Sequence, residues 1–173
     1  KFFNEEAFLV AHADNLTIFD MKDFASKHAA RPRETELTMM VFAAPDPQSC
    51  GIVTLDSQNV VQAFHEKVAN PPGTLANAAV YMIEPSVVDM MATLGKKQMD
   101  FSTGVIPHLL GKMLTYRNTD YHRDIGSPSS WIKANLDFTM VPAISQNPDD
   151  LGGNHGDRRW TTRIYDRWFV SFC

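Results

Sequence analysis

The sequence lacks the features that mark several large classes of protein. Only two cysteines, Cys50 and Cys173, occur in 173 residues, which argues against a disulfide scaffold and favours two free thiols in a reducing cytosol over a single bridge. No run approaches the roughly 20 apolar residues of a membrane helix. Residues 1–6 contain neither the apolar core nor the cleavage site of a signal peptide. We therefore expect a cytoplasmic protein without a membrane segment.

Basic charge is also scarce. Sixteen lysines and arginines stand against 20 aspartates and glutamates, giving a formal net charge of −4. A surface built for nucleic-acid phosphates is therefore not expected. The hydrophobic fraction of 44% and charged fraction of 21% are those of a folded domain and not of a disordered tail. The length corresponds to one domain or slightly more.

Apolar runs, capping residues and turn residues predict an α/β fold. Strands are expected at 8–13, 37–44, 75–83 and 114–117, a β-hairpin at 51–55 and 60–66, and helices at 21–29, 86–94, 100–110 and 129–135. Their alternation predicts a mixed sheet flanked by helices, with the hairpin as its antiparallel element. Residues 139–173 combine a Pro-, Asn-, Asp- and Gly-rich stretch with an aromatic and arginine-rich tail, and they are left unplaced.

Two aspartates are candidates for a metal site. Asp14 follows the first predicted strand, and Asp124 lies between a predicted strand and a predicted helix. Ligands of open α/β sheets collect at the carboxyl ends of strands, and Mg²⁺ commonly takes one or two protein carboxylates. The alternative is that both carboxylates only accept hydrogen bonds from backbone donors at the start of a loop.

Three further residues are candidates for binding a substrate. Glu66 and Lys67 end the hairpin, where they could hold sugar hydroxyls and a phosphate or simply form a solvated strand end. Asn77 interrupts an apolar strand, and an unpaired buried amide costs about 1–3 kcal/mol. Its partner is therefore expected to be either a neighbouring loop or a ligand.

Other common site signatures are missing. The six histidines show no i, i+4 pairing and no cysteine partner, so they form no metal set. No serine-centred nucleophile motif occurs. The glycine-rich stretch 152–157 follows no predicted strand and opens no predicted helix, so it is interpreted as a loop and not as a phosphate cradle.

Five stretches, taken in order, resemble the nucleotidyltransferase domain of the sugar-1-phosphate nucleotidylyltransferases. This family includes mannose-1-phosphate guanylyltransferases and glucose-1-phosphate thymidylyl- and adenylyltransferases. The stretches are 8–16 (FLVAHADNL), 50–53 (CGIV), 64–67 (FHEK), 77–81 (NAAVY) and 121–128 (YHRDIGSP). They are similar to a strand ending in Gly-Asp, to Tyr-Gly-Val, to Phe-x-Glu-Lys-Pro, to Asn-Ala-Gly-x-Tyr and to Trp-x-Asp-x-Gly-Thr-Pro. The matching region is 5–138.

The resemblance implies a Rossmann-like mixed sheet and a role for each matching residue. Asp14 and Asp124 would hold Mg²⁺, and Lys67 would join them as a catalytic residue. The sugar phosphate would be bound by Gly51, Glu66, Lys67 and Asn77. The implied substrates are a nucleoside triphosphate and a sugar 1-phosphate, and the implied products are a nucleotide-sugar and pyrophosphate. Neither a nucleic-acid partner nor a membrane partner is implied, and homo-oligomerisation stays open.

The departures from the motifs leave alternatives open. Ala13 and Ala79 replace glycines, and Val68 stands where a proline is usual. The family's opening glycine-rich loop has no counterpart, so 1–138 is expected to be the sugar-phosphate-binding and metal-binding half of a domain whose nucleotide-binding half is absent. The alternatives to an enzyme are a catalytically inactive regulatory or scaffolding module, and a fragment with no activity alone.

Overall fold

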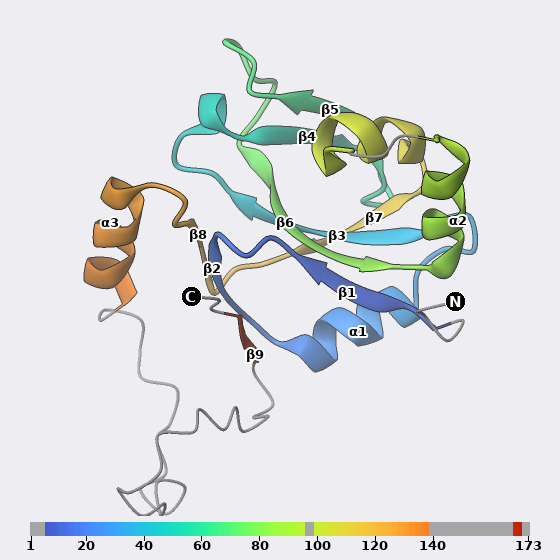
Figure 1. The fold of residues 1–173 in the computed structure, drawn as a ribbon, viewed down its shortest axis with the longest axis horizontal. Coiled ribbons are helices and arrows are strands. Elements are labelled where there is room, and N and C mark those ends of the chain that lie inside the picture. The colour runs from blue at the N-terminus through green and yellow to red at the C-terminus, as the bar shows by residue number, and fades with distance from the viewer. Residues whose placement is uncertain (1–5, 96–98, 139–167, 171–173) are drawn as a thin grey trace, which may run out of the picture.

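The computed structural model describes residues 6–95, 99–138 and 168–170 (Figure 1). The strands are β1 (Phe8–Ala11), β2 (Asn15–Phe19), β3 (Leu37–Ala43), β4 (Gly51–Leu55), β5 (Val61–Glu66), β6 (Leu75–Ile83), β7 (Met113–Arg117), β8 (Tyr121–Asp124) and β9 (Trp168–Val170). The helices are α1 (Met21–Ala29), α2 (Pro85–Thr93) and α3 (Pro128–Phe138). Single turns form η1 (Pro47–Ser49), η2 (Phe101–Val105) and η3 (Ile106–Leu109). Within these described ranges, no helix is long and apolar enough to cross a membrane.

The strands form two sheets. The larger sheet has six strands in the order β5-β4-β6-β3-β7, with β1 joined to β6. β3 and β7 run parallel, and the remaining neighbours run antiparallel. The smaller sheet, β8-β2-β9, lies at one end of the larger one (Figure 1). The mixed α/β fold predicted from the sequence is confirmed.

The larger sheet separates two hydrophobic cores. Alternate residues of a strand point to opposite faces, so Leu37 and Met39 of β3 pack on one face whereas Met40 packs on the other. The first face is covered by α2, η2 and η3, which contribute buried side chains. The second face is covered by α1 and β2. β1, β6 and β3 thus lie between two apolar layers, which hold these strands in place.

The helix α1 forms where its sequence predicts it. The Asp20 side chain caps its N-terminus by accepting a hydrogen bond from the Asp23 backbone N–H at 3.0 Å. Phe24 is completely buried beneath the sheet, where it contacts Phe19 and Tyr116 edge-on or tilted. This single aromatic anchors α1, because truncating a buried Phe to Ala costs about 3–5 kcal/mol.

One expectation from the sequence is corrected. The helix predicted over 100–110, bent at Pro107, is instead a π-helical turn, η2, followed by a 3₁₀ turn, η3. Pro107 lacks an N–H and its ring clashes with an earlier carbonyl, so here it interrupts the helix and does not only bend it. The strands β2 and β8 were not among the predicted elements; they form by pairing with each other across more than a hundred residues of sequence. Of the unplaced residues 139–173, only β9 is described, and it pairs with β2.

α1 carries a buried histidine, His28, near its C-terminal end. His28 is 4% exposed, with Nδ1 2.8 Å from Thr38 Oγ1 and Nε2 3.0 Å from Glu84 Oε1. Arg31 also bonds Glu84, at 2.6 Å. Burial lowers the pKa of His28; the Arg31 charge lowers it further, and Glu84 opposes the shift. The folded protein therefore favours the neutral imidazole.

We predict that His28 makes the fold sensitive to mild acid. The unfolded chain protonates His28 near its ordinary pKa of about 6.5, whereas the folded chain resists the proton. The stability that neutral His28 contributes is present above that pH and is lost as pH falls below it. Urea unfolding between about pH 8 and pH 5 should show a flatter profile for His28→Gln than for the wild type. The exposed His108→Gln is the control and should keep the wild-type slope; parallel profiles for all three proteins would contradict the prediction.

Candidate functional site

The candidate residues come from adjoining strands: Gly51 begins β4, Glu66 ends β5 and Asn77 lies near the start of β6. On the β4–β5 side, Gly51 pairs directly with Glu66. A Cβ placed on Gly51 would lie 2.7 Å from Glu66 Oε2 and would also collide with the Phe64 ring. Glycine is thus required at position 51 because the Phe64 and Glu66 side chains fold across the backbone there. The sequence motif flagged Gly51 and Glu66, and the hairpin brings them into contact.

β6 is irregular at the level of the site. Its register with β3 shifts between Met39, which faces Tyr81, and Val41, which faces Asn77. Ala79 lies inside this β-bulge with a φ of 53°, a left-handed conformation that alanine adopts only at a cost of about 1–2 kcal/mol. The Asn77 side chain closes the bulge, since Oδ1 accepts from the Ala79 N–H at 2.9 Å and Nδ2 donates to the Tyr81 hydroxyl at 2.7 Å.

The carbonyl groups of the bulge hold the turn that carries Asp14. The His12 N–H donates to Ala79 O at 3.0 Å, and the buried Asn15 side chain donates from Nδ2 to Ala78 O at 3.3 Å. These two bonds flank Asp14 on both sides. The turn between β1 and β2 is therefore fixed to β6 and leaves the Asp14 side chain exposed.

The structure brings Asp14 and Asp124 close together. Asn15 is paired with Asp124 across β2 and β8, and the Ile125 N–H donates to Asp14 O at 2.7 Å. A Cβ placed on Gly126 would lie 3.2 Å from Asp124 Oδ1 and 3.3 Å from Asp14 Oδ2. The two carboxylates therefore border one small space beside Gly126. Asp124 Oδ1 also accepts from the Gly126 N–H at 2.8 Å.

Cys50 directly precedes Gly51 at the start of β4. Burial raises the pKa of its thiol, and the carboxylates of Asp46, Asp124 and Glu66 raise it further. Both Asp124 and Glu66 are thus near enough to Cys50 to act on it electrostatically. Cys50 is a free thiol, and its raised pKa makes it a poor nucleophile. Its position links the hairpin residues to the aspartate pair.

Lys67 adds a cation at the same edge. Its side chain is 67% exposed and its Nζ lies 3.9 Å from Glu66 Oε1. Lys67 has a φ of 49°, and its N–H donates to Cys50 O at 3.2 Å. The left-handed backbone turns Lys67 out of the hairpin, so its ammonium group reaches into solvent beside Glu66 and not into the sheet.

The aspartate pair has the chemistry of a small divalent-cation site. Both side chains are exposed, and Mg²⁺ is commonly held by one or two carboxylates with water and phosphate oxygens completing its shell. In the part of the chain that the structure describes, no group of three or more His, Cys, Asp or Glu side chains could hold a metal alone. The residues thus fit a cation that shares its ligands with a substrate, and they do not fit a structural metal.

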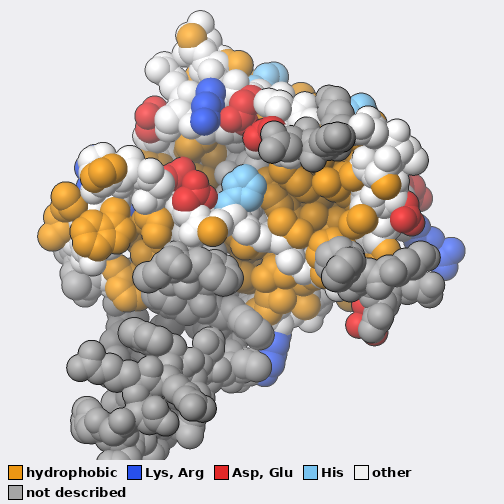
Figure 2. All heavy atoms as spheres, in the orientation of Figure 1, with side chains coloured by type: hydrophobic (Ala, Val, Ile, Leu, Met, Phe, Trp, Pro, Cys, Tyr) orange, Lys and Arg blue, Asp and Glu red, His pale blue; other side chains and the backbone are white. Residues whose placement is uncertain are grey.

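The contacts that three residues make in the site are not visible in the sequence. Gly126 lies beside the two carboxylates, Asn15 ties the Asp14 turn to β6, and Tyr81 holds the Asn77 amide. The motif stretches contain all three residues, but only the tertiary structure shows what each contacts. Asn77, expected to bond a loop or a ligand, bonds its own strand. Figure 2 shows acidic and histidine side chains between an apolar area over α3 and another over β1 and β6.

Comparison with known proteins shows which family the chain belongs to. A family model described as nucleotidyl transferase matches residues 1–140. The chain belongs to this family. It is 28% identical over 154 residues to a mannose-1-phosphate guanylyltransferase of Mycobacterium tuberculosis, covering 87% of this chain and 41% of that protein. It is 26% identical over 147 residues to a glucose-1-phosphate adenylyltransferase of Lachnospira eligens, covering 82% of this chain and 35% of that protein.

A solved structure shows the same fold. A glucose-1-phosphate thymidylyltransferase of Bacillus anthracis, in complex with a sucrose, superimposes with a TM-score of 0.65 at 15% identity. The superposition covers 76% of this chain and 54% of that one. The chain thus shares the Rossmann-like mixed sheet of that structure. It spans about two fifths or less of the length of these curated relatives.

One departure from the nucleotidyl transferase motif has a visible structural cost. Ala79 occupies the position of the motif's glycine and still takes the left-handed conformation that glycine adopts freely. The fold is therefore maintained against the preference of this side chain. Ala13, the other alanine in place of a glycine, is exposed and its φ is not positive.

We predict that Ala79→Gly stabilises this nucleotidyl transferase. The substitution removes the left-handed strain, which outweighs the added flexibility of glycine in the unfolded chain, for a net gain of about 0.5–1 kcal/mol. Chemical denaturation measures the change. Ala78→Gly is the matched control, because Ala78 is the neighbouring residue of β6, is buried and has no positive φ. That variant should lose about 1 kcal/mol; a loss at both positions would show that Ala79 is not strained.

Proposed function

We propose that this chain provides the sugar-phosphate-binding and metal-binding part of an enzyme that makes a nucleotide-sugar. A phosphate oxygen of a sugar 1-phosphate attacks the α-phosphorus of a nucleoside triphosphate. The new P–O bond forms as the bond between the α-phosphorus and the bridging oxygen breaks, and pyrophosphate leaves. The observation that carries the proposal is the meeting of Asp14 and Asp124 at Gly126, beside the edge that carries Glu66 and Lys67.

The aspartate pair would act on the phosphate groups. The Ile125 N–H holds the backbone carbonyl of Asp14, and the Gly126 N–H holds the carboxylate of Asp124. The two aspartates therefore need little reorganisation when a cation and its phosphates arrive. When bound, Mg²⁺ would neutralise part of the negative charge of the phosphate groups. No protein nucleophile is required, because phosphoryl transfer depends mainly on positioning and electrostatics. This agrees with the raised pKa of Cys50.

The hairpin and β6 would bind the sugar 1-phosphate. Glu66 carries carboxylate oxygens that accept from sugar hydroxyls, and Lys67 carries a cation for the phosphate. Gly51 leaves room for the Glu66 side chain, and the second N–H of the Asn77 amide remains available beyond its bond to Tyr81. These four residues lie on adjoining strands, so one substrate could contact all of them.

We predict that Mg²⁺ affinity depends on the space that Gly126 leaves between the two carboxylates. In Gly126→Ala, a methyl group would lie in contact with both carboxylates, so Mg²⁺ affinity measured by calorimetry should fall about tenfold or more. Gly126 has no positive φ, so alanine adds no backbone strain there. Gly73→Ala is the control, because nothing lies within 4 Å of its Cβ position. Equal Mg²⁺ affinity in the two variants would remove the aspartate pair as a metal site.

We predict that Asp124→Asn abolishes nucleotidyl transfer. Pyrophosphate release would be followed with a nucleoside triphosphate, a sugar 1-phosphate and Mg²⁺, using the chain alone and within a longer polypeptide. The rate should fall more than about a hundredfold. Loss of a residue that only supports a metal ligand already costs up to about a hundredfold, and Asp124 would be a ligand itself. Asp89→Asn, an exposed aspartate on α2, should leave the rate unchanged. Normal turnover by Asp124→Asn would overturn the assignment.

Ala79 favours one alternative, an inactive nucleotidyltransferase-like module. A methyl group on a strained backbone beside Asn77 occupies space that glycine leaves open for a ligand. Such a module would bind a sugar phosphate or nucleotide-sugar without turnover and would act as a regulatory or scaffolding part. Binding of nucleotide-sugar with no pyrophosphate release in either wild type or Ala79→Gly would favour this function. Release restored by Ala79→Gly alone would identify the methyl group as the cause of inactivity.

A further inference from the structure

An exposed histidine, His12, lies beside the candidate site. It directly follows β1 and comes two residues before Asp14. Its ring lies edge-on to the Tyr81 ring, with 6.4 Å between the centroids and 66° between the planes. Within the described residues, no hydrogen bond or ion pair engages the imidazole. Both ring nitrogens are therefore available to a ligand.

The position of the His12 ring is fixed by β6. The His12 N–H donates to Ala79 O at 3.0 Å, which anchors the backbone to the bulge. Tyr81 is completely buried and offers the imidazole a surface that does not shift. Val10 pairs with Tyr81, and His12 comes two residues after Val10, so all three side chains lie on one face of the sheet. The imidazole is thus oriented before any substrate arrives.

The same face carries groups proposed to bind the sugar. The Tyr81 hydroxyl accepts from Asn77 Nδ2 at 2.7 Å. Burial raises the pKa of Tyr81, the Asn77 hydrogen bond opposes that shift, and the Glu66 carboxylate adds to it. Tyr81 therefore has Glu66, from the end of β5, and His12, from the end of β1, as neighbours. A substrate held by Asn77 and Glu66 lies within reach of the imidazole.

His12 also lies between the sugar-binding groups and the aspartate pair. Its N–H bonds the bulge that Asn77 closes, and its chain continues into Asp14, which borders one space with Asp124. In the proposed reaction, the phosphate of the sugar 1-phosphate must reach both the sugar site and the cation. That phosphate would therefore lie at the level of His12.

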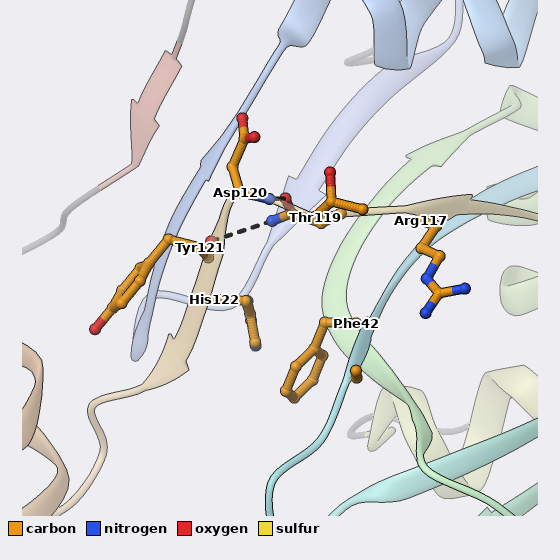
Figure 3. A pocket seen from close by; sticks show the side chains of 8 residues that line it. Phe42, Arg117, Thr119, Asp120, Tyr121 and His122 are labelled. Atoms are coloured by element: carbon orange, nitrogen blue, oxygen red, sulfur yellow. Dashed lines mark hydrogen bonds between the residues drawn. The ribbon is translucent and has the colours of Figure 1, made fainter. Parts of the chain in front are cut away.

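A second histidine of this region offers no comparable group. The His122 ring packs against Phe42 with 4.2 Å between the centroids, and Figure 3 shows the two side chains facing each other. His122 Nδ1 is buried and has no hydrogen-bond partner, so a ligand in the adjoining cavity cannot reach that atom. Of the two imidazoles, His12 is the one that can meet a substrate.

We propose that His12 binds the phosphate of the sugar 1-phosphate. Its imidazole N–H donates to a phosphate oxygen, and Lys67 approaches the same group from the hairpin. This proposal rests on the proposed function, because it takes the sugar phosphate to bind beside Asn77 and Glu66. A phosphate oxygen is the favoured acceptor, since hydrogen bonds to an ionised acceptor are about twice as strong as those between neutral groups.

Two substitutions separate hydrogen-bond donation from packing. His12→Phe keeps an aromatic ring against Tyr81 and removes the N–H, whereas His12→Gln keeps an N–H donor and removes the ring. Calorimetry measures binding of glucose 1-phosphate and of mannose 1-phosphate to the full 173-residue chain with Mg²⁺. His12→Phe should bind both about tenfold to a hundredfold more weakly than wild type, the cost of one hydrogen bond to a charged group. His12→Gln should recover most of that loss.

Two controls accompany these variants. His108→Phe changes an exposed histidine on η3 and should keep the wild-type affinity for both sugar phosphates. The Mg²⁺ affinity of His12→Phe, measured without a sugar phosphate, should equal that of the wild type, because both carboxylates remain in place.

Any of three results overturns the proposal. The first is an absence of sugar phosphate binding by the wild type up to about 10 mM. The second is equal affinity of wild type and His12→Phe, which would leave His12 only a packing role. The third is a parallel loss of Mg²⁺ affinity in His12→Phe, which would assign the effect to the Asp14 turn.

This test and the test of the proposed function can fail separately. If the wild type binds sugar phosphates and His12→Phe loses them, but no pyrophosphate is released, the proposed function fails and the role of His12 stands. If pyrophosphate release is normal and His12→Phe binds like the wild type, only the role of His12 fails.

Discussion

The interruption of the β3–β6 ladder is the constraint on which the candidate site depends. The bulge around Ala79 turns two carbonyl groups of β6 toward the β1–β2 turn, where His12 and Asn15 bond them. Those bonds fix Asp14, and Asp14 O in turn receives the Ile125 N–H next to Asp124. A regular β6 would direct these carbonyls into the ladder, and the two aspartates would lose their shared support.

Electrostatics explains why this support must be firm. Two carboxylates that border one space repel each other, and the repulsion is largest where water is partly excluded. The Gly126 N–H offsets part of it by bonding Asp124 Oδ1. In the proposed function, a cation bound between the carboxylates would offset this repulsion. A site of this kind is held by backbone geometry, since the charged groups themselves would separate.

Local patterns predicted much of the fold. The capped helix α1, the apolar strands β3 and β6 and the β4–β5 hairpin form at or within a residue or so of their expected bounds, because each depends on short-range periodicity or turn chemistry. β2 and β8 were not predicted, since β8 is a short polar strand whose only reason to form is its distant partner. The helix expected over 100–110 with a bend at Pro107 is replaced by two short turns, because Pro107 interrupts the backbone hydrogen bonds more completely than a bend requires.

The sequence by itself determined the family, the alternation of strands and helices and the identity of the candidate residues, because these depend on residue type and order. It could not determine that Ala79 takes a left-handed backbone or that Asp14 and Asp124 come together beside Gly126. Each of these depends on contacts between residues far apart in the chain. The free energy of such contacts is set by packing and hydrogen bonding in the assembled sheets, and no local pattern encodes it.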